Sequence, residues 1–392
     1  MDKNRRRLYH LLLNFYKIKL SGGNFTEDYF EDEPFRKVYR KIYFELFRHL
    51  PFIEKEISIH IKKDTPIELF AAIVLGTTQI LFLDDIPDYA AVNETVSLVN
   101  KNQRGFVNAV LRNIIKEKGE ILKRHSIFDD YPVWFIDKLR KKFSENELIE
   151  LLKSFNTPPE NYYFDFKDFT FKKYEDIEDV PKDALACDVA SANIPLLTKN
   201  FSPQKIMDSC AAPGGKTVIL SKLHTNANID AFEKSEKRCN KLVENINRYR
   251  CKNVNVINAD VLKYTHSADY DLILVDPPCS ALGTIRRHPE VRYLRDNITI
   301  KKNAKRQLDF LNYLSQYLKN GGYIVYSVCS IEPEETFMVV ERFLEHNKNF
   351  TLLNLTEPKE FVHNGYYYTL PHKTNTDGFF GAVLIKDDGK SN

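Results

Sequence analysis

The sequence predicts an all-helical N-terminal part and an α/β C-terminal part with a doubly wound parallel sheet. In the first part, apolar residues from Phe35 to Leu50 recur at alternating spacings of three and one, as on one face of a helix. From residue 186 onward, short apolar runs alternate with helical patterns, which favours parallel strands joined by helices. Several of these runs end in an acid or a cysteine, so reactive side chains are expected along one edge of the sheet.

The helical part is expected to extend over residues 1–125. The segment 65–68 predicts a helix start, with Thr65 as N-cap and Glu68 completing a capping box. The almost wholly apolar run from Phe70 to Leu83 predicts the central helix of a bundle. Further along, Arg104 and Arg112 could bind phosphate, although their spacing is equally typical of a solvated helix face.

Residues 126–185 combine helical patterns with one alternating segment. A helix is predicted around Trp134, and a second one over 144–155, where Ser144 and Glu147 would form a capping box. The run from Tyr162 to Phe166 alternates as a strand does. We therefore divide the chain into a helical domain (1–125), a connector (126–185) and an α/β domain (186–392).

The stretch from Asp271 to His288 organises the α/β part. Its apolar run, residues 272–275, predicts a strand buried in a parallel sheet. The following proline pair lacks amide hydrogens and ends that strand. Asp276 and Cys279 are therefore expected where ligands bind in open α/β sheets, beyond the carboxyl ends of the strands.

A second stretch predicts a ligand-binding turn. A short strand through Asp208 enters a small-residue turn that contains Gly214 and Gly215, and an apolar helix follows. Glycines let backbone amides approach a ligand, and the amides at a helix start are unpaired. The turn has neither the G-x-G-x-x-G nor the P-loop spacing. The next predicted strand ends at Glu233, where an acid suits a ribose diol.

A third predicted strand, Tyr323 to Val328, ends at a second cysteine, Cys329. Two cysteines thus follow predicted strands, and a disulfide between them is not expected in a chain without a secretory signal. The six cysteines show no metal-ligand spacing, so no metal site is predicted.

Composition indicates a globular protein without a membrane partner. The net charge is +3 and 28% of residues are charged, which by itself carries no strong bias toward nucleic acid. The apolar runs are shorter than a membrane span, and the N-terminal segment lacks the apolar core of a signal peptide. We therefore expect a cytoplasmic protein, and we take a monomer as the working expectation.

The three stretches together resemble the RNA cytosine-5 methyltransferases that use S-adenosylmethionine, and among them the bacterial RsmB type, which acts on 16S ribosomal RNA. Further family marks are Gly283 to Glu290 and Asp377 to Phe380. In the helical part, 75–79, 86–91 and Arg104 to Arg112 resemble the NusB-like domain of that type. The resemblance implies a Rossmann-like methyltransferase domain preceded by an all-α NusB-like RNA-binding domain, with a shortened RNA-contacting subdomain between them.

The resemblance also assigns roles to residues. Cys329 would attack carbon 6 of cytosine, Cys279 would assist proton removal and release, and Asp276 would stabilise protonation at ring nitrogen 3. S-adenosylmethionine would supply the methyl group, and no metal would be required. The residues implied in cofactor binding are Cys210, Ala211, Ala212, Pro213, Gly214, Gly215, Lys216, Glu233, Arg238, Asp260 and Asp276. Those expected to contact RNA are Arg104, Arg112, Arg286, Arg287 and His288, near a basic cluster of Lys301, Lys302, Lys305 and Arg306.

Two residues depart from the family pattern, and two other functions stay open. Val328 stands where a threonine commonly precedes the nucleophile, and Glu233 stands where an aspartate is frequent. The same motifs would serve a methyltransferase that acts on transfer RNA, and a non-catalytic RNA-binding factor is a further alternative. The missing G-x-G-x-x-G disfavours a nicotinamide oxidoreductase.

Overall fold

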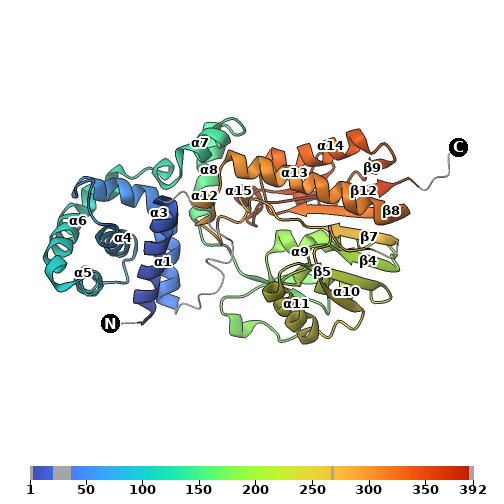
Figure 1. Ribbon diagram of the computed structural model, residues 1–392, viewed down its shortest axis with the longest axis horizontal. Coiled ribbons are helices and arrows are strands. Elements are labelled where there is room, and N and C mark those ends of the chain that lie inside the picture. Colours follow the sequence, from blue (N-terminus) through green and yellow to red (C-terminus); the bar gives the residue numbers. More distant parts are fainter. Residues whose placement is uncertain (1–2, 21–36, 266–268, 388–392) are drawn as a thin grey trace. The chain divides into compact units, whose positions relative to one another are not determined.

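The computed structural model describes residues 3–20, 37–265 and 269–387, which form two compact units (Figure 1). The first unit contains the chain up to Asn156 together with Arg292–Leu294, and the second contains Thr157–Val291 and the chain from Arg295 onward. This division falls within the connector predicted at 126–185, whose helices count with the first unit and whose strands count with the second. Phe35, the first residue of the predicted apolar face, lies outside the described residues.

The first unit is all helical, as predicted. Its central helix, α4 (Ile67–Phe82), is buried along most of its length and packs against four other helices, α1, α3, α5 and α6. Apolar side chains from these helices form one core. The other elements are α1 (Lys3–Leu20), α3 (Lys37–Ser58), α5 (Asp88–Val96), η1 (Lys101–Gln103), α6 (Arg104–Arg124), η2 (Ile127–Asp130), α7 (Val133–Arg140) and α8 (Glu145–Asn156).

The capping box predicted at the start of α4 is wrong. Pro66 occupies the N-cap position, and no side chain caps the helix there. The Thr65 hydroxyl instead donates to the carbonyl of Lys62 at 2.7 Å, because such a hydroxyl can satisfy local backbone groups outside a helix. In the second predicted box, the Ser144 hydroxyl does accept from the amide of Glu147, at 3.4 Å.

Within its described residues, the second unit contains a three-stranded and a nine-stranded sheet. The small antiparallel sheet has the order β2-β1-β3, and the large one runs β10-β11-β12-β8-β7-β4-β5-β6 with β9 beside β12. The strands are β1 (Tyr162–Asp165), β2 (Thr170–Lys173), β3 (Leu185–Cys187), β4 (Lys205–Asp208), β5 (Asn228–Glu233), β6 (Val254–Asn258), β7 (Tyr270–Val275), β8 (Leu318–Val328), β9 (Phe350–Leu352), β10 (Val362–His363), β11 (Tyr366–Thr369) and β12 (Phe379–Lys386).

The predicted parallel pairing holds for β4 to β8, and the strands after β8, for which no prediction was made, pair antiparallel. β4, β5, β6, β7 and β8 pair in parallel, whereas β12 pairs antiparallel with β8, β9 and β11. The link between β11 and β12 is too short for a helical crossover, so these strands can only be antiparallel neighbours. The sheet is therefore mixed.

Helices cover both faces of the large sheet, which confirms the Rossmann-like arrangement. One face carries α9 (Val189–Leu196), α10 (Gly215–Leu223) and α11 (Glu236–Arg248), and the other carries α13 (Asn297–Leu314) and α14 (Phe337–His346) (Figure 1). Alternate residues of β7 enter the two cores between these layers. Across the described ranges, no helix combines the length and apolarity that crossing a membrane requires.

Candidate active site

Two thiols meet at the carboxyl ends of neighbouring strands, where the sequence predicted them. Asp276 and Cys279 follow β7, and Cys329 follows β8, which is the parallel neighbour of β7. The two sulfur atoms lie 3.1 Å apart. The hydrogen bond with Cys329, together with burial, raises the pKa of the Cys279 thiol well above its usual range. The Cys279 thiol is therefore held in its protonated form.

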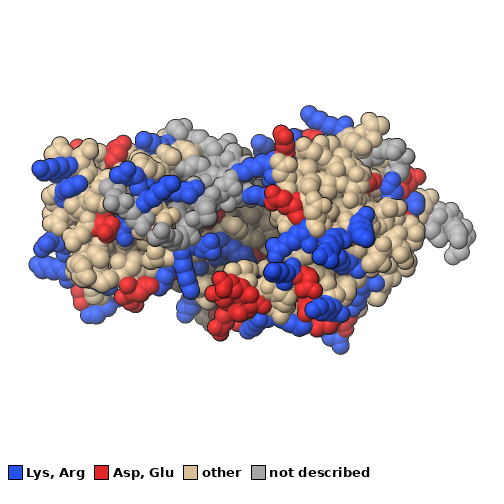
Figure 2. All heavy atoms as spheres, turned by 90° about the horizontal axis from the view of Figure 1, so that it is seen from below, with Lys and Arg blue, Asp and Glu red and all other residues tan. Residues whose placement is uncertain are grey.

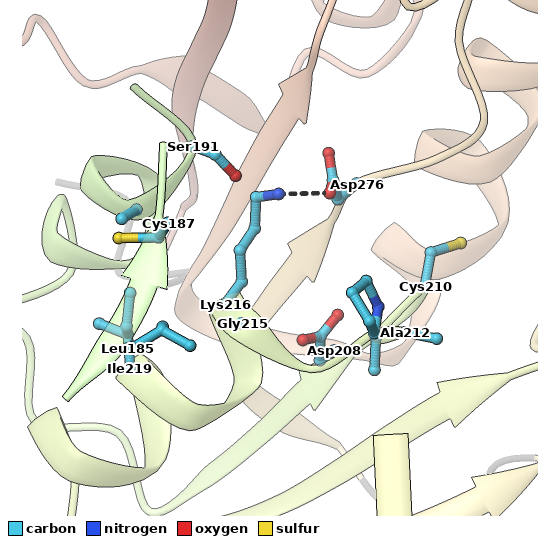
Figure 3. A pocket seen from close by; sticks show the side chains of 13 residues that line it. Leu185, Cys187, Ser191, Asp208, Cys210, Ala212, Gly215, Lys216, Ile219 and Asp276 are labelled. Atoms are coloured by element: carbon cyan, nitrogen blue, oxygen red, sulfur yellow. Dashed lines mark hydrogen bonds and ion pairs between the residues drawn. The ribbon is translucent and has the colours of Figure 1, made fainter. Parts of the chain in front are cut away.

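Asp276 is held on both of its oxygens. Nζ of Lys216, in the first turn of α10, lies 2.8 Å from Oδ2, as Figure 3 shows, and the Ser327 hydroxyl donates to Oδ1 at 2.9 Å. Burial lowers the pKa of the Lys216 ammonium, but the charge of Asp276 and the hydrogen bond to it outweigh burial and raise that pKa. The carboxylate therefore has a fixed orientation. Ser327 had no predicted role, since its importance depends on the neighbouring strand.

A cavity of about 130 Å³ opens beside Lys216 and Asp276 (Figure 3). Most of the turn predicted to bind the cofactor lines this cavity, namely Cys210, Ala211, Ala212, Pro213, Gly215 and Lys216. The sequence did not indicate the residues of β3 and α9 that complete the wall, which are Leu185, Cys187, Ser191 and Ala192. No local pattern indicates these residues, because their position beside the glycine turn depends on the tertiary fold.

Asp208 presents an unpaired oxygen in the lining of the same cavity. Its Oδ2 accepts from the Thr217 hydroxyl at 2.7 Å, whereas the buried Oδ1 has no hydrogen-bond partner. Burial raises the pKa of this carboxyl group to about 6. Buried polar atoms are normally satisfied, so an unpaired carboxylate oxygen in a cavity indicates a ligand that donates a hydrogen bond there.

The glycine turn has the backbone that its sequence predicted. Gly214 adopts a φ of +112°, a conformation that favours glycine. A Cβ atom at this position would also lie only 2.9 Å from Cδ1 of Leu242. Because α10 begins at Gly215, the unpaired amides of its first turn lie beside the cavity and suit an anionic group.

The two other predicted acids follow adjacent strands, outside the cavity lining. Glu233 ends β5 and is nearly buried, and its Oε1 accepts from the amide of Ser235 at 2.8 Å. Arg238 lies 3.8 Å from Oε2 of Glu233 and donates to the carbonyl of Ala212 at 2.9 Å, which ties α11 to the glycine turn. Asp260 follows β6 and pairs with Lys234 at 2.9 Å.

The residues predicted to contact RNA differ in exposure. Arg104 and Arg112 are exposed on α6, and their spacing of eight places them on one helix face. His288 is exposed as well. Arg287 is half-buried, because its Nε donates to Asp377 at 2.8 Å. These four residues keep at least part of their side chains at the surface.

The position of Arg286 contradicts its predicted contact with RNA. The residue is only 2% exposed. Its guanidinium donates to the carbonyls of Thr157 and Pro158 at 3.3 Å and to Oδ1 of Asn375 at 3.0 Å. The charge is thus used inside the fold, and sequence alone could not distinguish it from the neighbouring Arg287.

Basic side chains also lie on α13. The cluster predicted there is exposed, with Lys301, Lys302, Lys305 and Arg306 all at the surface. On the face of the molecule shown in Figure 2, Lys and Arg side chains are interspersed with Asp and Glu. This mixture agrees with the small net charge of +3.

In the part of the chain that the structure describes, one cluster has the composition of a metal site, and it lies in the first unit: His49, His125 and Asp130. Nδ1 of His49 and Nε2 of His125 lie 2.8 and 2.9 Å from the same carboxylate oxygen of Asp130. The amide of Asn156 donates to the other oxygen at 2.8 Å. Protein donors therefore satisfy this carboxylate, and we interpret the cluster as a hydrogen-bond network. That the reaction needs no metal stays a prediction.

Comparisons with known proteins agree for both units. Residues 196–385 match the model of a family described as 16S rRNA methyltransferase RsmB/F, and residues 5–116 match that of the NusB family. The chain is 30% identical over 356 residues to ribosomal RNA small subunit methyltransferase B of Enterobacter sp. (strain 638), which covers 80% of this chain and 82% of that protein. It is 29% identical over 374 residues to the probable ribosomal RNA small subunit methyltransferase B of Coxiella burnetii, with 83% and 86% covered. The crystal structure of PH0851 has a TM-score of 0.74 at 20% identity, covers 98% of this chain and 99% of its own, and supports the fold.

Proposed function

We propose, from the premise that this chain belongs to the RsmB family of ribosomal RNA small subunit methyltransferases, that it methylates carbon 5 of a cytosine in 16S ribosomal RNA. The observation that carries this finer assignment is the pair of thiols 3.1 Å apart, at strand ends that also carry Asp276. Methyl transfer to an oxygen or an exocyclic nitrogen needs no nucleophilic thiol. Transfer to carbon 5 needs one thiol for attack and a further base for proton removal.

The chemistry starts from a weakly nucleophilic ring carbon. The Cys329 thiolate adds to carbon 6, and the electron pair of the ring double bond moves toward nitrogen 3, which takes a proton from solvent and returns it when the aromatic ring is restored. Asp276, oriented by Lys216 and Ser327, stabilises that protonated nitrogen. Carbon 5 then has enamine character and accepts the methyl group that S-adenosylmethionine supplies.

Cys279 acts after methyl transfer. While Cys329 is a thiolate, the hydrogen bond between the two sulfur atoms keeps the proton on Cys279. Once Cys329 is bound to carbon 6, that hydrogen bond is lost and Cys279 can release its proton to solvent. It then accepts the proton of carbon 5, the ring double bond forms again, and Cys329 leaves as thiolate.

The residues at the sheet edge fit the parts of S-adenosylmethionine. The unpaired Oδ1 of Asp208 suits the ammonium group of the methionine end, and the amides after Gly214 suit its carboxylate. Glu233 suits the ribose hydroxyls, and Asp260 lies on the side expected for adenine. These residues follow β4, β5 and β6, which are consecutive in the sheet, in the order of the parts of the cofactor.

RNA contacts are proposed for the basic residues whose side chains are exposed or partly exposed. These are Arg104, Arg112, Arg287, His288 and the basic cluster of α13, with Arg286 left out. Because the attacking thiol must reach the face of the ring, the target cytosine has to be unpaired or flipped out of a helix.

Methyl transfer from labelled S-adenosylmethionine tests the substrate. Purified 16S ribosomal RNA, small ribosomal subunits and transfer RNA are incubated side by side, and the labelled base is identified. We expect 5-methylcytosine in 16S ribosomal RNA, free or in the subunit. Label in transfer RNA alone would keep the chemistry and refute the substrate, and cofactor binding without label in any RNA would favour the non-catalytic alternative.

Cysteine variants test the two thiol roles. Cys329→Ala should lose both methyl transfer and the covalent protein–RNA adduct, because attack fails. Cys279→Ala should accumulate a denaturant-stable adduct, because attack survives and release fails. Cys251→Ala removes a cysteine outside the site and serves as the control. Normal turnover by Cys279→Ala would show that the assignment of the second thiol is wrong.

A further inference from the structure

Each of the two reactive cysteines is followed by a serine, and both serines bind one carboxylate, that of Glu335. The Ser330 hydroxyl donates to Oε2 of Glu335 at 2.6 Å, and the Ser280 hydroxyl donates to the same oxygen. The amide of Ser280 donates to Oε1 at 2.8 Å. The loops that follow β7 and β8 are therefore both bound by Glu335, which belongs to neither strand.

Glu335 is itself anchored from the opposite side. Its side chain is fully buried. Gln307, on α13, donates to Oε1 of Glu335 at 3.2 Å and to the carbonyl of Pro278 at 3.1 Å. The Tyr326 hydroxyl, on β8, donates to the backbone carbonyl of Glu335 at 2.6 Å. The carboxylate thus lies in a closed network, where each partner limits the movement of the others.

We propose that Glu335 is a positioning residue that sets the separation of the Cys279 and Cys329 sulfur atoms by holding the residue that follows each of them. Beyond the ends of β7 and β8 the two loops are joined directly by the Gly283 amide, which donates to the carbonyl of Cys329 at 3.0 Å, and by the hydroxyls of Ser280 and Ser330, which lie 3.1 Å apart. The carboxylate of Glu335 binds both serines and so holds this contact in place, which we call the clamp. The role of this clamp in catalysis rests on the proposed two-thiol chemistry. Its effect on the sulfur separation does not.

The length and the oxygens of the side chain both matter for this clamp. Aspartate is one methylene shorter and cannot reach Ser280 and Ser330 together while Gln307 holds it. Glutamine keeps the length and one oxygen, and its amide nitrogen can donate to a serine hydroxyl in place of accepting from it. Glu335→Gln should therefore retain most of the positioning, whereas Glu335→Asp and Glu335→Ala should lose it.

The sulfur separation is measured by oxidation, without reference to methyl transfer. The azo oxidant diamide takes two electrons and two protons from a pair of thiols, which form a disulfide while the N=N bond becomes a hydrazine. The initial rate of the Cys279–Cys329 disulfide, mapped by peptide mass spectrometry, reports how often the sulfur atoms meet. We expect this rate to fall about tenfold or more in Glu335→Ala and Glu335→Asp and to stay within about threefold in Glu335→Gln.

Glu56→Gln provides the matched control. Glu56 is 1% exposed and is paired with Arg124 in the first unit, so its loss disturbs a buried acid far along the chain from either cysteine. We expect the control to oxidise at the wild-type rate. A wild-type rate in Glu335→Ala would overturn the proposal.

The contacts of Ser280 and Ser330 with Glu335 can be removed one at a time. These serine variants also test the proposal if Glu335→Ala does not fold. Ser330→Ala loosens the loop of Cys329 and should slow adduct formation. Ser280→Ala loosens the loop of Cys279 and should slow adduct release, so adduct accumulates. Both should slow disulfide formation. If both serine variants oxidise at the wild-type rate, the clamp does not position the thiols, whereas slow oxidation without any 5-methylcytosine in the wild type would refute the proposed function alone.

Discussion

Asp130 in the helical unit and Glu335 in the methyltransferase unit are fully buried carboxylates that are satisfied in different ways. Asp130 contacts two imidazoles, those of His49 and His125, and a side-chain amide. Glu335 contacts two hydroxyls, a backbone amide and a side-chain amide. Both acids are buried to the same degree, so the difference between them comes from their partners.

The hydrogen-bond partners of each carboxylate decide whether the rise in pKa caused by burial is offset. Burial favours the neutral acid at both sites, yet the hydrogen bonds from His125 and His49 outweigh it and lower the pKa of Asp130. At Glu335 the donors are neutral, burial prevails, and the pKa is raised. A partner that can carry positive charge therefore stabilises a buried carboxylate as an ion, whereas hydroxyls and amides mainly fix its geometry. We infer that Asp130 contributes chiefly to stability and Glu335 chiefly to positioning.

Removing Asp130 altogether should have the largest effect. Asp130→Ala leaves His49, His125 and Asn156 without their common partner and should destabilise the helical unit by about 3 kcal/mol. Unfolding in urea can be followed through Trp134, the only tryptophan of the chain, which lies on α7 of this unit. Asp137→Ala, at an exposed position of α7, is the control and should change the free energy of unfolding little. An equal effect of both variants would refute the structural role of the network.

Amide substitutions sharpen the comparison between the two acids. Asp130→Asn keeps the shape but loses the charge that the imidazoles favour, and should cost about 2 kcal/mol. Glu335→Gln replaces an acid among neutral donors, and should cost about 1 kcal/mol or less. Hydrogen exchange of α3 peptides for the first variant and of β8 peptides for the second measures the two costs in the full chain. The reverse order would show that partner charge does not govern these sites.

The sequence predicted the rim of the active site because local signals mark it. The apolar run 272–275, the proline pair and Cys279 lie within ten residues of one another, and each has a local physical meaning. Gly214 likewise signals its own backbone conformation. The positions of Cys329 and Glu233 followed because parallel strands end at one edge. The sequence therefore predicted correctly the position of those acids and cysteines that stand at the end of a recognisable strand.

What the sequence could not predict depends on contacts between distant segments. Glu335 meets Ser280 across 55 residues, and no local pattern distinguishes it from the adjacent acid Glu334. The same limit explains Arg286, whose burial depends on Thr157 and Pro158. No strand was predicted after β8, so the antiparallel strand β12 is an addition from the structure, in a region where alternation with helices stops after α14.

The pH dependence of stability should separate the two sites further. Burial lowers the pKa of His49, but the hydrogen bonds that its imidazole donates to Asp130 and Glu45 outweigh burial and raise that pKa above its ordinary value of 6.5. Protonated His49 therefore contributes stability that is complete below pH 6.5 and is lost as the pH rises through the folded-state pKa. Asp130, with a pKa lowered from 3.8, contributes stability that is lost only as the pH falls through its own folded-state pKa.

The helical unit should thus be most stable between these limits and less stable at about pH 8 than at about pH 6. The charged groups that face His49 are Glu45 and Asp130, and Arg48 lies beside Glu45. His49→Gln should remove most of the difference between the two pH values, as read from the urea midpoint of Trp134 fluorescence. A pH slope that persists in this variant would assign the titration to another group.

A last substitution tests whether this core accepts a polar group that has no partner. Val328 precedes Cys329 on β8 and is fully buried among apolar residues opposite Phe380. Val328→Thr, which introduces the residue common in the family, should cost about 1 to 2 kcal/mol because it buries a hydroxyl among apolar side chains. Val325→Thr, equally buried on the same strand, is the matched control and should cost the same in hydrogen exchange of β8. If Val328→Thr were neutral while the control was destabilised, a group near Cys329 would have to accept the hydrogen bond of the threonine hydroxyl. The cost of a buried polar group would then depend on its partners at this position as it does at Glu335.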